Sequence, residues 1–397
     1  MTFISPGIET VRLKMRVDRT RHIKQGYPWI YRDWLTETPA APPGSRALVR
    51  DRDGKLLAFG FYDPENPLAV RVCATESEQL DDALIVQRLE ASIANRSPLA
   101  AGNTTGYRWV NGEGDLLPGL VCDRYDQCAV IKLDGAAPEA FWNSAQLSEW
   151  FVTSTPVEGL YQRFRNAERG VGQWLRGRDL STTVHFTENG IQFVADIAVG
   201  QKTGFFFDQR ENRDRIRLLA KDRRTLNLFG YTGGFSVYAG KGGASQVTTV
   251  DIAKPAIAAA RENWRHNGLA PSEHEAIAED AFEFLSRASE ASRVWDLIIV
   301  DPPSFAASQK QVERATESYT TLFARAFGCL ASQGVIALSS CSSHISMQQF
   351  LEIIRSACSK ARRRSAVLGV YGQPLDHPFP LLCTELQYLK FVLLQTH

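Results

Sequence analysis

The second half of the chain repeats one pattern, in which short apolar runs of strand length alternate with longer segments of helical spacing. The clearest apolar runs lie at 226–229, 246–251, 295–300 and 335–339. Helical spacing is clearest at 255–266 and 312–331. This order predicts an α/β fold with a doubly wound parallel sheet, completed by an antiparallel final strand from the pair near 365–371 and 388–394.

The first of these strands runs into a glycine-bearing turn, G-Y-T-G-G at 230–234, and the second ends at a carboxylate, Asp251. Such a unit is typical of nucleoside sites, because glycine lets the backbone approach the ligand and the carboxylate accepts from ribose hydroxyls. The dinucleotide fingerprint G-x-G-x-x-G is absent from this turn. A ligand without phosphate, such as S-adenosylmethionine, therefore fits better, and an ordinary α/β turn is the alternative.

Candidate ligand groups recur at the carboxyl ends of five predicted strands: Gly233, Asp251, Asp280, Asp301 and Cys341. Open α/β sheets bind ligands along that edge. We expect Asp251 to bind the ribose, and Asp280 with the backbone at Ala281 to bind the adenine amine. Each carboxylate has a simpler alternative role as a helix cap. Pro302 favours an extended backbone at Asp301, which holds that side chain at its strand end.

Cys341 lies in S-C-S-S-H, one strand beyond Asp301. A cysteine there can attack carbon 6 of a pyrimidine, which moves electron density onto carbon 5 and prepares it for a methyl group. A protonated Asp301 could hydrogen-bond the ring nitrogen N3 and stabilise the charge that develops there. A cysteine is only a few per cent thiolate near neutral pH, so a donor or base must help, and Ser342, Ser343 and His344 are at hand. The alternatives are a structural histidine and a cysteine that only packs.

The first 75 residues show strand alternation instead. Val11, Leu13, Met15 and Val17 alternate with basic residues, which predicts a strand with one apolar and one basic face. Further strands near 45–50, 56–62 and 69–73 predict a small β-barrel-like module. The basic side chains of the first segment favour a phosphate-binding surface or, alternatively, a charged edge that resists aggregation: Arg12, Lys14, Arg16, Arg19, Arg21 and Lys24.

Residues 76–195 are expected to form a linking α+β domain, which gives a division into 1–75, 76–195 and 196–397. Arg108 and Arg163 could contact RNA there, or could pair with nearby carboxylates. Asn189-Gly190 predicts a type I′ hairpin turn within 186–196. In the stretch that follows, K-T-G-F-F-F-D-Q-R at 202–210, we expect a helix to begin near Asp208 with that residue as its cap.

In their order along the chain these motifs resemble a known family, the PUA-containing class I methyltransferases that form 5-methylcytosine in bacterial 23S ribosomal RNA. The matching stretches include G-x-P-W-I-Y, K-T-G-F-F-x-D-Q-R, N-L-F-x-Y-T-G-G-F-S, D-P-P-S-F, S-C-S-S-H and Y-L-K, and they cover nearly the whole chain. The resemblance implies an N-terminal RNA-binding PUA domain, a middle α+β domain and a Rossmann-like class I methyltransferase sheet. Ser304 departs from related RNA methyltransferases, which place a second cysteine after the D-P-P motif to aid product release.

The resemblance also implies roles for individual residues. Cys341 would be the nucleophile, with ribosomal RNA as the substrate. Asp301 is the expected second catalytic residue, and Arg163 is an expected RNA contact, both from the residues themselves. S-adenosylmethionine would be the cofactor, held by Asn227, Phe229, Tyr231, Thr232, Gly233, Gly234, Asp251, Ile252, Asp280, Ala281, Asp301, Phe206, Asp208 and Arg210. The alternative for 205–210 is an aromatic cluster packed beneath a solvated helix start.

Whole-chain composition narrows the class further. The 45 basic and 44 acidic residues nearly cancel, so net charge indicates no partner. We expect no signal peptide, no transmembrane helix, and no disulfide or metal site, because the seven cysteines are scattered without C-x-x-C. These features favour a cytoplasmic protein, with a homodimer as an open alternative. Three rivals stay open: a methyltransferase for exocyclic nitrogens, a non-catalytic RNA-binding or ribosome-assembly factor, and an oxidoreductase.

Overall fold

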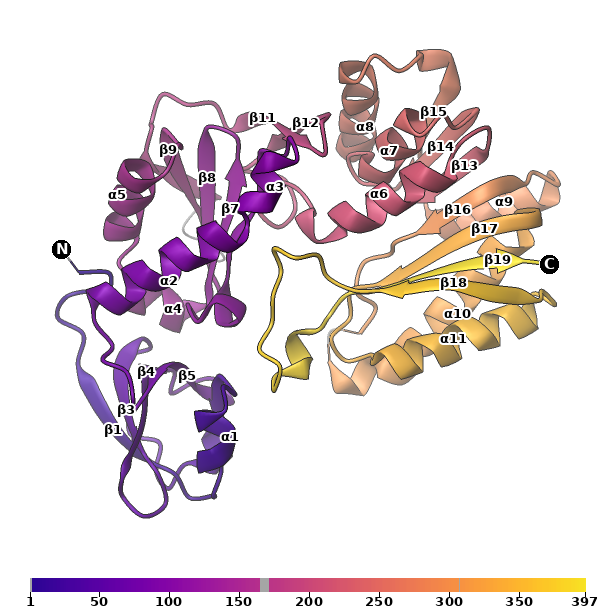
Figure 1. Ribbon diagram of the computed structural model, residues 1–397. Helices are drawn as coiled ribbons and strands as arrows, with labels where there is room; N and C mark the ends of the chain where they lie inside the picture. The colour runs from indigo at the N-terminus through magenta and orange to yellow at the C-terminus, as the bar shows by residue number, and fades with distance from the viewer. Residues whose placement is uncertain (1, 165–170, 307) are drawn as a thin grey trace. The chain divides into compact units, whose positions relative to one another are not determined.

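The computed structural model describes residues 2–164, 171–306 and 308–397, which divide into two compact units (Figure 1). Each unit combines separate stretches of the chain. The first contains Met1–Gly190, Ala195–Phe207 and Leu375–Leu386, and the second contains Ile191–Val194, Asp208–Pro374 and Gln387–His397. The first two predicted domains thus share one unit, and the finer division into three stays a prediction.

A mixed five-stranded sheet begins the first unit, in the order β1-β3-β4-β5-β2. Its strands are β1 (Thr10–Lys14), β2 (Trp29–Tyr31), β3 (Ser45–Arg50), β4 (Leu56–Tyr62) and β5 (Leu68–Thr75). Leu13 is buried while Arg12 and Lys14 are exposed, which confirms a strand with two chemically different faces. The strand is shorter than predicted, however. Asp18 accepts from the backbone N–H of Thr20 at 3.2 Å and turns the chain into α1 (Thr20–Lys24), so Val17 is outside the strand and Arg21 and Lys24 are helical.

A second sheet of the first unit has the order β10-β9-β8-β7-β6. Its strands are β6 (Gly106–Asn111), β7 (Leu120–Tyr125), β8 (Cys128–Leu133), β9 (Gly159–Arg163) and β10 (Gly172–Arg176). Its helices are α2 (Asp82–Asn95), α3 (Ser97–Ala101), α4 (Ala136–Phe141) and α5 (Ser144–Ser154). A hairpin follows, β11 (Thr183–Glu188) and β12 (Ile191–Asp196), and positive φ angles of 52° at Asn189 and 75° at Gly190 confirm the predicted turn.

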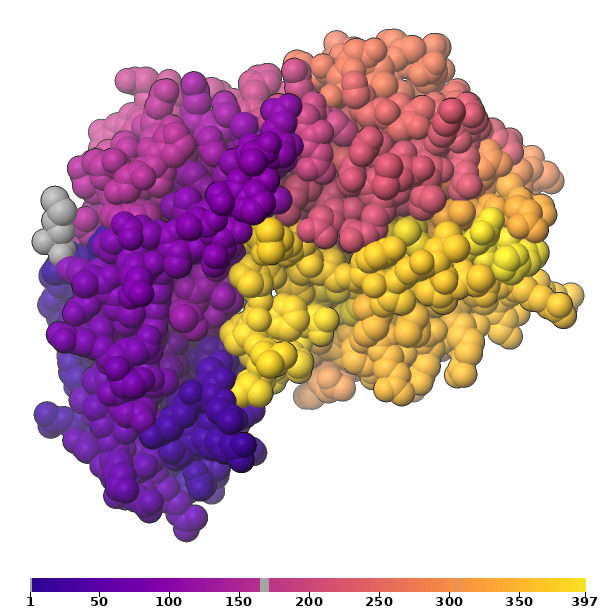
Figure 2. Space-filling model, viewed as in Figure 1, coloured from indigo at the N-terminus to yellow at the C-terminus, as the bar shows by residue number. Residues whose placement is uncertain are grey.

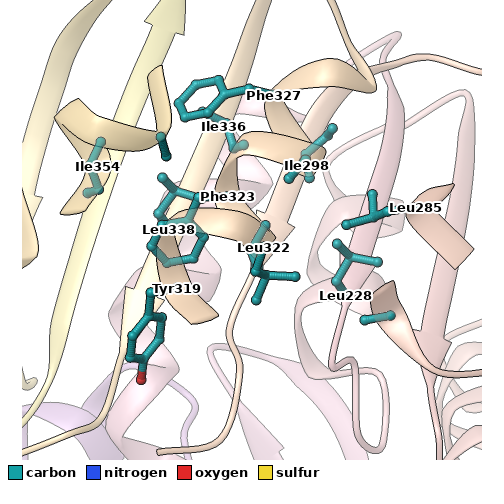
Figure 3. Close-up of a cluster of buried hydrophobic side chains, with 14 of the residues drawn as sticks. Leu228, Leu285, Ile298, Tyr319, Leu322, Phe323, Phe327, Ile336, Leu338 and Ile354 are labelled. Carbon is teal, nitrogen blue, oxygen red and sulfur yellow. The ribbon is translucent and has the colours of Figure 1, made fainter. Parts of the chain in front are cut away.

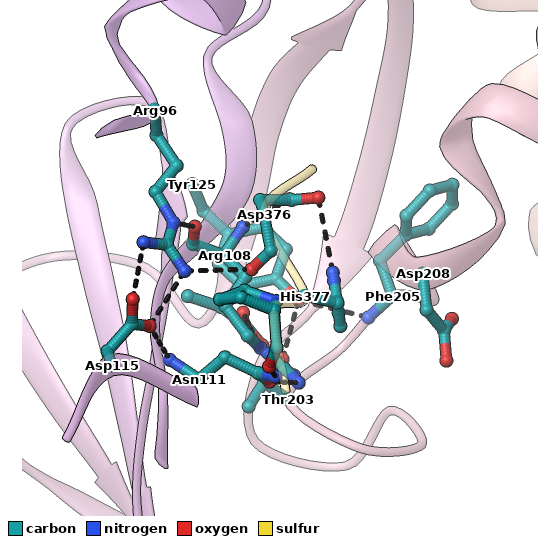
Figure 4. A network of polar contacts seen from close by, with 12 residues as sticks. Arg96, Arg108, Asn111, Asp115, Tyr125, Thr203, Phe205, Asp208, Asp376 and His377 are labelled. Carbon is teal, nitrogen blue, oxygen red and sulfur yellow. Dashed lines mark hydrogen bonds and ion pairs between the residues drawn. The ribbon is translucent and has the colours of Figure 1, made fainter. Parts of the chain in front are cut away.

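A buried polar network lies inside this first unit (Figure 4). Arg96 donates to both carboxylate oxygens of Asp115 at 2.7 Å, and Arg108 pairs with Asp123 at 2.8 Å. Asp376, from the late segment Leu375–Leu386, accepts from the backbone N–H of Arg108 at 3.0 Å. Arg108 therefore takes the carboxylate-pairing role that was the alternative to RNA contact. Figure 2 shows residues of the same late segment, in yellow, at the surface beside the indigo N-terminal chain.

The second unit is built on a seven-stranded sheet, ordered β15-β14-β13-β16-β17-β19-β18. Its strands are β13 (Arg224–Leu228), β14 (Gln246–Asp251), β15 (His274–Ala278), β16 (Trp295–Val300), β17 (Leu330–Ser340), β18 (Ser365–Tyr371) and β19 (Lys390–Thr396). The first five in the order run parallel, and β19 is antiparallel to both neighbours. The predicted parallel sheet with an antiparallel final strand is confirmed.

Helices cover both faces of this sheet, as expected for strands that are apolar on both sides. They are α6 (Arg210–Leu219), α7 (Gly234–Lys241), α8 (Lys254–His266), α9 (Ala281–Glu290), α10 (Val312–Gly328) and α11 (Met347–Lys360). Ile298 packs with Leu322 and Phe323 of α10 in one hydrophobic cluster (Figure 3). Its chain neighbours Leu297 and Ile299 belong to a second hydrophobic cluster. Within the described ranges no helix is both long and apolar enough to cross a bilayer.

Candidate active site

The parallel strands of the second unit end along one edge because they are in register. Leu228 pairs with Val250 on one side and with Val300 on the other, and Val300 pairs with Leu338. The residues at or just after the ends of these strands therefore lie side by side. They are the turn at 230–234, Asp251, Asp301 and Cys341, and Asp280 follows the neighbouring β15. The predicted candidates therefore share one edge of the parallel sheet, as open α/β folds require of a ligand site.

The turn after β13 has a strained, tightly bonded backbone. Phe229, Tyr231 and Gly233 have positive φ angles of 58°, 47° and 80°. The N–H of Gly230 donates to Val250 O at 2.9 Å, and the N–H of Gly233 donates to Gly230 O at 2.8 Å. A Cβ atom at position 233 would come within 2.9 Å of the Ala260 Cβ. Only glycine fits there without displacement, and such strain is characteristic of ligand sites.

Asp251 ties this turn to the helix that follows its own strand. One carboxylate oxygen accepts from the N–H of Tyr231 and the other from the N–H of Ala253, each at 2.9 Å. A carboxylate oxygen has more than one lone pair, so these bonds leave it able to accept from a ligand hydroxyl as well. Its neighbour Ile252 is 73% exposed. Asp251 is not itself the cap of α8, because Ala253 occupies the N-cap position. The predicted ribose role of Asp251 is compatible with both backbone bonds and stays a prediction.

Two buried polar atoms beside the turn fit a polar ligand. Among the described residues, Asn227 Oδ1 and Thr232 Oγ1 have no hydrogen-bond partner. Buried polar atoms in this condition are rare in folded proteins. The amide nitrogen of Asn227 is used, since it donates to Ser236 Oγ at 2.9 Å. The orphaned oxygens, the glycine turn and Asp251 together suit a nucleoside bearing hydroxyl and amino donors.

A chain of buried hydrogen bonds continues from Ser236 beneath the turn. Ser236 Oγ lies 2.6 Å from Thr249 Oγ1, which lies 2.7 Å from His274 Nε2. Burial, with the positive charge of Arg261, lowers the pKa of His274 to about 4. The imidazole is therefore neutral at physiological pH and supports the turn as a hydrogen-bonding group.

Asp280 fulfils its simpler predicted role as the N-cap of α9. Its Oδ1 accepts from the N–H groups of Phe282 at 2.8 Å and Glu283 at 3.2 Å. Both bonds use the same oxygen, so the second oxygen can still serve an adenine amine. The adenine role for Asp280 and Ala281 stays a prediction.

Asp301 is held by a residue that sequence reasoning did not select, Gln209. The Gln209 side-chain nitrogen donates to Asp301 Oδ1 and to Ser339 Oγ, each at 3.0 Å. Asn212 donates in turn to the Gln209 side-chain oxygen at 2.7 Å, and Gln209 is 3% exposed. Gln209 lay within a matched motif, but a neutral amide gave no separate signal of its own.

The prediction that Asp208 caps the next helix is wrong. A 3-10 turn (Phe207–Gln209) comes first, α6 begins at Arg210, and Gln209 occupies the cap position. The Asp208 carboxylate instead accepts from the Tyr388 hydroxyl at 2.7 Å, and Arg210 is buried. Phe206 belongs to the first unit, where the Lys202 ammonium lies 4.6 Å from its ring centre. Cofactor contacts from these three residues stay predictions.

Cys341, which is half-buried, directly follows β17 and is surrounded by polar groups. Ser340 Oγ donates to the Tyr319 hydroxyl at 3.1 Å, and Ser342 Oγ donates to Ala306 O at 2.9 Å. The ammonium of Lys390 donates to the carbonyl of Ser342, the residue after Cys341. Burial lowers the pKa of Lys390 to about 8, against the opposing effect of Cys341. Lys390 appeared in the sequence only as part of Y-L-K.

The other six cysteines lie in a different environment. All seven are in the described part of the chain, and none forms a disulfide. Burial raises the pKa of Cys73, Cys128 and Cys383 to about 12, which keeps these thiols protonated. Ser343 and His344, suggested as helpers for Cys341, are both exposed.

The predicted RNA-binding side chains all lie in the first unit. Arg12, Lys14 and Arg16 are exposed around β1, and the Arg19 guanidinium lies 5.3 Å from the centre of the Trp34 ring. Lys24 pairs with Glu76, and Arg163 donates to the carbonyl of Gly200. Arg163 therefore has a structural role, and RNA contact by any of these residues stays a prediction.

Comparison with known proteins identifies the family. A model of the S-adenosylmethionine-dependent methyltransferases matches residues 147–361, which include the whole edge from Asn227 to Cys341. This chain belongs to that family. A PUA-like domain model matches residues 11–75, the sheet from β1 to β5. The methyltransferase thus uses S-adenosylmethionine as its cofactor and carries a PUA-like domain at its N-terminal end.

Individual relatives align along nearly the full length of the methyltransferase. A Ribosomal RNA large subunit methyltransferase of Deinococcus radiodurans is 39% identical, covering 98% of this chain and 99% of the relative. A Ribosomal RNA large subunit methyltransferase I of Photobacterium profundum is 34% identical, covering 94% and 96% respectively. A solved structure of a candidate SAM-dependent methyltransferase from Streptococcus mutans has the same fold, with a TM-score of 0.84 at 23% identity, covering 97% of this chain and 100% of its own.

Proposed function

We propose that this methyltransferase forms 5-methylcytosine in large-subunit (23S) ribosomal RNA, through a covalent bond between Cys341 and the target base. One observation carries the proposal. Cys341 and Asp301 follow neighbouring parallel strands, and the glycine turn of the cofactor site follows the strand on the other side of Asp301. The names of the relatives from Deinococcus radiodurans and Photobacterium profundum support ribosomal RNA as the substrate.

The cysteine supplies what cytosine carbon 5 lacks, which is nucleophilic strength. The Cys341 thiolate forms a bond to carbon 6, and the electron pair of the carbon 5–carbon 6 double bond moves toward carbon 5 and N3. S-adenosylmethionine, when bound, supplies the methyl group that carbon 5 accepts. Loss of the carbon 5 proton to a base then restores the double bond as the sulfur–carbon bond breaks, and the thiolate is regenerated.

Asp301 stabilises the charge that develops on the ring. In its protonated form it donates a hydrogen bond to N3 of the base. Gln209 supports this role because it fixes the carboxyl group at Oδ1 and joins it to Ser339 of the strand that precedes Cys341. The nucleophile and the charge-stabilising group are thereby held on adjacent strand ends by one buried amide.

The chain's own residues orient the cofactor on the same edge. Asp251 binds the ribose hydroxyls, and Asn227 and Thr232 offer buried oxygens that lack partners among the described residues. The absence of a side chain at Gly233 keeps the turn close to α8. Asp280 and Ala281 bind the adenine, and the basic residues around β1 bind RNA phosphates.

The proposal is tested by comparing ribosomal RNA from cells that lack the gene with RNA from the parent strain. Bisulfite sequencing and nucleoside mass spectrometry should show one 5-methylcytosine in the parent's 23S RNA and an unmodified cytosine in the deletion strain. Restoring the gene should restore the mark, whereas the Cys341→Ala variant should not. A deletion strain that retains every 5-methylcytosine would refute the proposed substrate, and methylation at an exocyclic nitrogen would favour the non-covalent alternative.

A further inference from the structure

Lys390 stands in an unusual place for a lysine. It is the first residue of β19, a strand whose next four residues are all buried and apolar, and it is 2% exposed. In the ladder between β17 and β19 it pairs directly with Ser340, so it lies beside the end of the strand that Cys341 follows. Burying an ammonium group is costly unless other groups compensate for the lost water.

The hydrogen bonds of Lys390 supply no negative charge to offset the burial of its ammonium group, and Cys341 can supply one. Its ammonium donates to the carbonyl of Ser342 and, at 2.7 Å, to the carbonyl of Tyr388. Both partners are neutral carbonyl dipoles, and neither carries a charge. Burial lowers the pKa of Lys390 to about 8, while the negative charge available on Cys341 favours the ammonium form. The amine is therefore poised to exchange a proton near neutral pH.

Two titratable groups of the described chain, Lys390 and Tyr319, interact electrostatically with Cys341, and Asp301 acts on Tyr319 from the neighbouring strand end. Lys390 lies on β19, Tyr319 lies on α10, and Asp301 follows β16. Burial, partly offset by the hydrogen bond from Ser340, raises the pKa of Tyr319 to about 12, and the charges of Cys341 and Asp301 act in the same direction as burial. Tyr319 is therefore a neutral hydroxyl at physiological pH. Of the three groups, only Lys390 can bring a positive charge to the thiolate.

We propose that Lys390 is the positioning residue that holds Cys341 as a thiolate. The S–H bond of Cys341 breaks, its proton forms a new N–H bond on the neutral amine of Lys390, and the products are a thiolate and an ammonium group. No other reactant is needed. Because the thiolate is regenerated when the sulfur–carbon bond breaks, the proton stays on Lys390 through the cycle. The inference rests on the proposed role of Cys341 as nucleophile.

The test measures the thiol itself, apart from methylation. Full-length protein carrying Cys358→Ser, which removes the other half-buried cysteine, is labelled with iodoacetamide from pH 5 to 10, and Cys341 alkylation is followed by peptide mass spectrometry. The pH at which Cys341 alkylation is half-maximal, its midpoint, should lie below the pKa of an ordinary cysteine, which is about 8.5. Lys390→Met should raise the midpoint by about one pH unit, and Lys390→Arg, which keeps the charge, should leave it low.

Two controls separate the effect of the lost Lys390 charge from the effect of a damaged fold. Lys360→Met replaces an exposed lysine on α11 and should not change the midpoint. Thermal melting and S-adenosylmethionine binding report whether each variant is folded, and the midpoint of the unsubstituted protein decides the question if Lys390→Met does not fold. A midpoint at or above about 8.5 in that protein, or one unchanged in folded Lys390→Met, would overturn the inference.

The same design separates this inference from the proposed function. A low midpoint that depends on Lys390 supports thiolate formation even if ribosomal RNA of the deletion strain keeps its 5-methylcytosine. In that case the substrate proposal fails alone. In the converse case, the deletion strain loses its 5-methylcytosine while Lys390→Met leaves the alkylation midpoint of Cys341 unchanged. That pair of results refutes only the role of Lys390.

Discussion

The side-chain nitrogen of Gln209 lies 3.0 Å from a carboxylate oxygen of Asp301 and 3.0 Å from Ser339 Oγ. We expect Gln209→Ala to lower kcat by about tenfold or more, because a small misplacement of a catalytic group is costly. Binding of S-adenosylmethionine should change by less than about threefold. Single-turnover methylation and calorimetry measure the two effects. Gln192→Ala, which alters an exposed glutamine on β12, is the control and should change neither quantity.

Asp251 accepts two backbone N–H groups at the cofactor edge, and Asp296 provides a matched aspartate near the start of β16. Asp296 accepts the backbone N–H of Arg224 at 2.9 Å and pairs with its guanidinium. Asp251→Asn should weaken S-adenosylmethionine binding by about 10- to 100-fold, since charge-assisted hydrogen bonds are lost. Asp296→Asn should leave the affinity unchanged in calorimetry. Equal effects of the two substitutions would show that Asp251 acts only through general stability.

Gly233 and Gly268 separate backbone strain from steric crowding. Both have positive φ angles, of 80° and 67°, but only Gly233 has close neighbours for an added Cβ. Gly268→Ala should cost about 1 kcal/mol of unfolding free energy through backbone strain alone. Gly233→Ala should cost about 1–3 kcal/mol more and weaken cofactor binding, because the turn must move away from α8. Urea unfolding of both variants, with calorimetry, checks this; an equal loss in both would remove the crowding argument.

His274 should make the fold sensitive to acid. Burial lowers the pKa of His274 from 6.5 to about 4, so the unfolded chain binds more protons than the folded chain between these values. Stability from this group is complete above pH 6.5 and is lost as the pH falls toward 4, by roughly 3 kcal/mol in all. His274→Gln should flatten the dependence of unfolding free energy on pH in this range. An unchanged slope would mean that other groups cause the acid sensitivity.

The sequence predicted the sheet and its functional edge because both depend on local pattern. Apolar runs marked these strands, and Asp251, Asp301 and Cys341 lie at or just beyond the ends of those runs. Gln209 and Lys390 were different, since their partners lie 92 and 48 residues away along the chain. Neither a neutral amide nor one lysine at a strand start reveals a distant partner. The error at Asp208 has a similar cause. Its carboxylate was expected to cap α6, but it accepts a hydrogen bond from Tyr388, which lies 180 residues away along the chain.

The most direct test of the central claim is covalent trapping of Cys341. Fluorine at carbon 5 cannot leave as a proton, so 23S RNA containing 5-fluorocytosine should stay bonded to the enzyme after methyl transfer. Denaturing gels and peptide mass spectrometry should show an adduct on Cys341 that needs S-adenosylmethionine, persists in Cys358→Ala and is lost in Cys341→Ala. No adduct with the unsubstituted protein, together with full methylation by Cys341→Ala, would contradict the account.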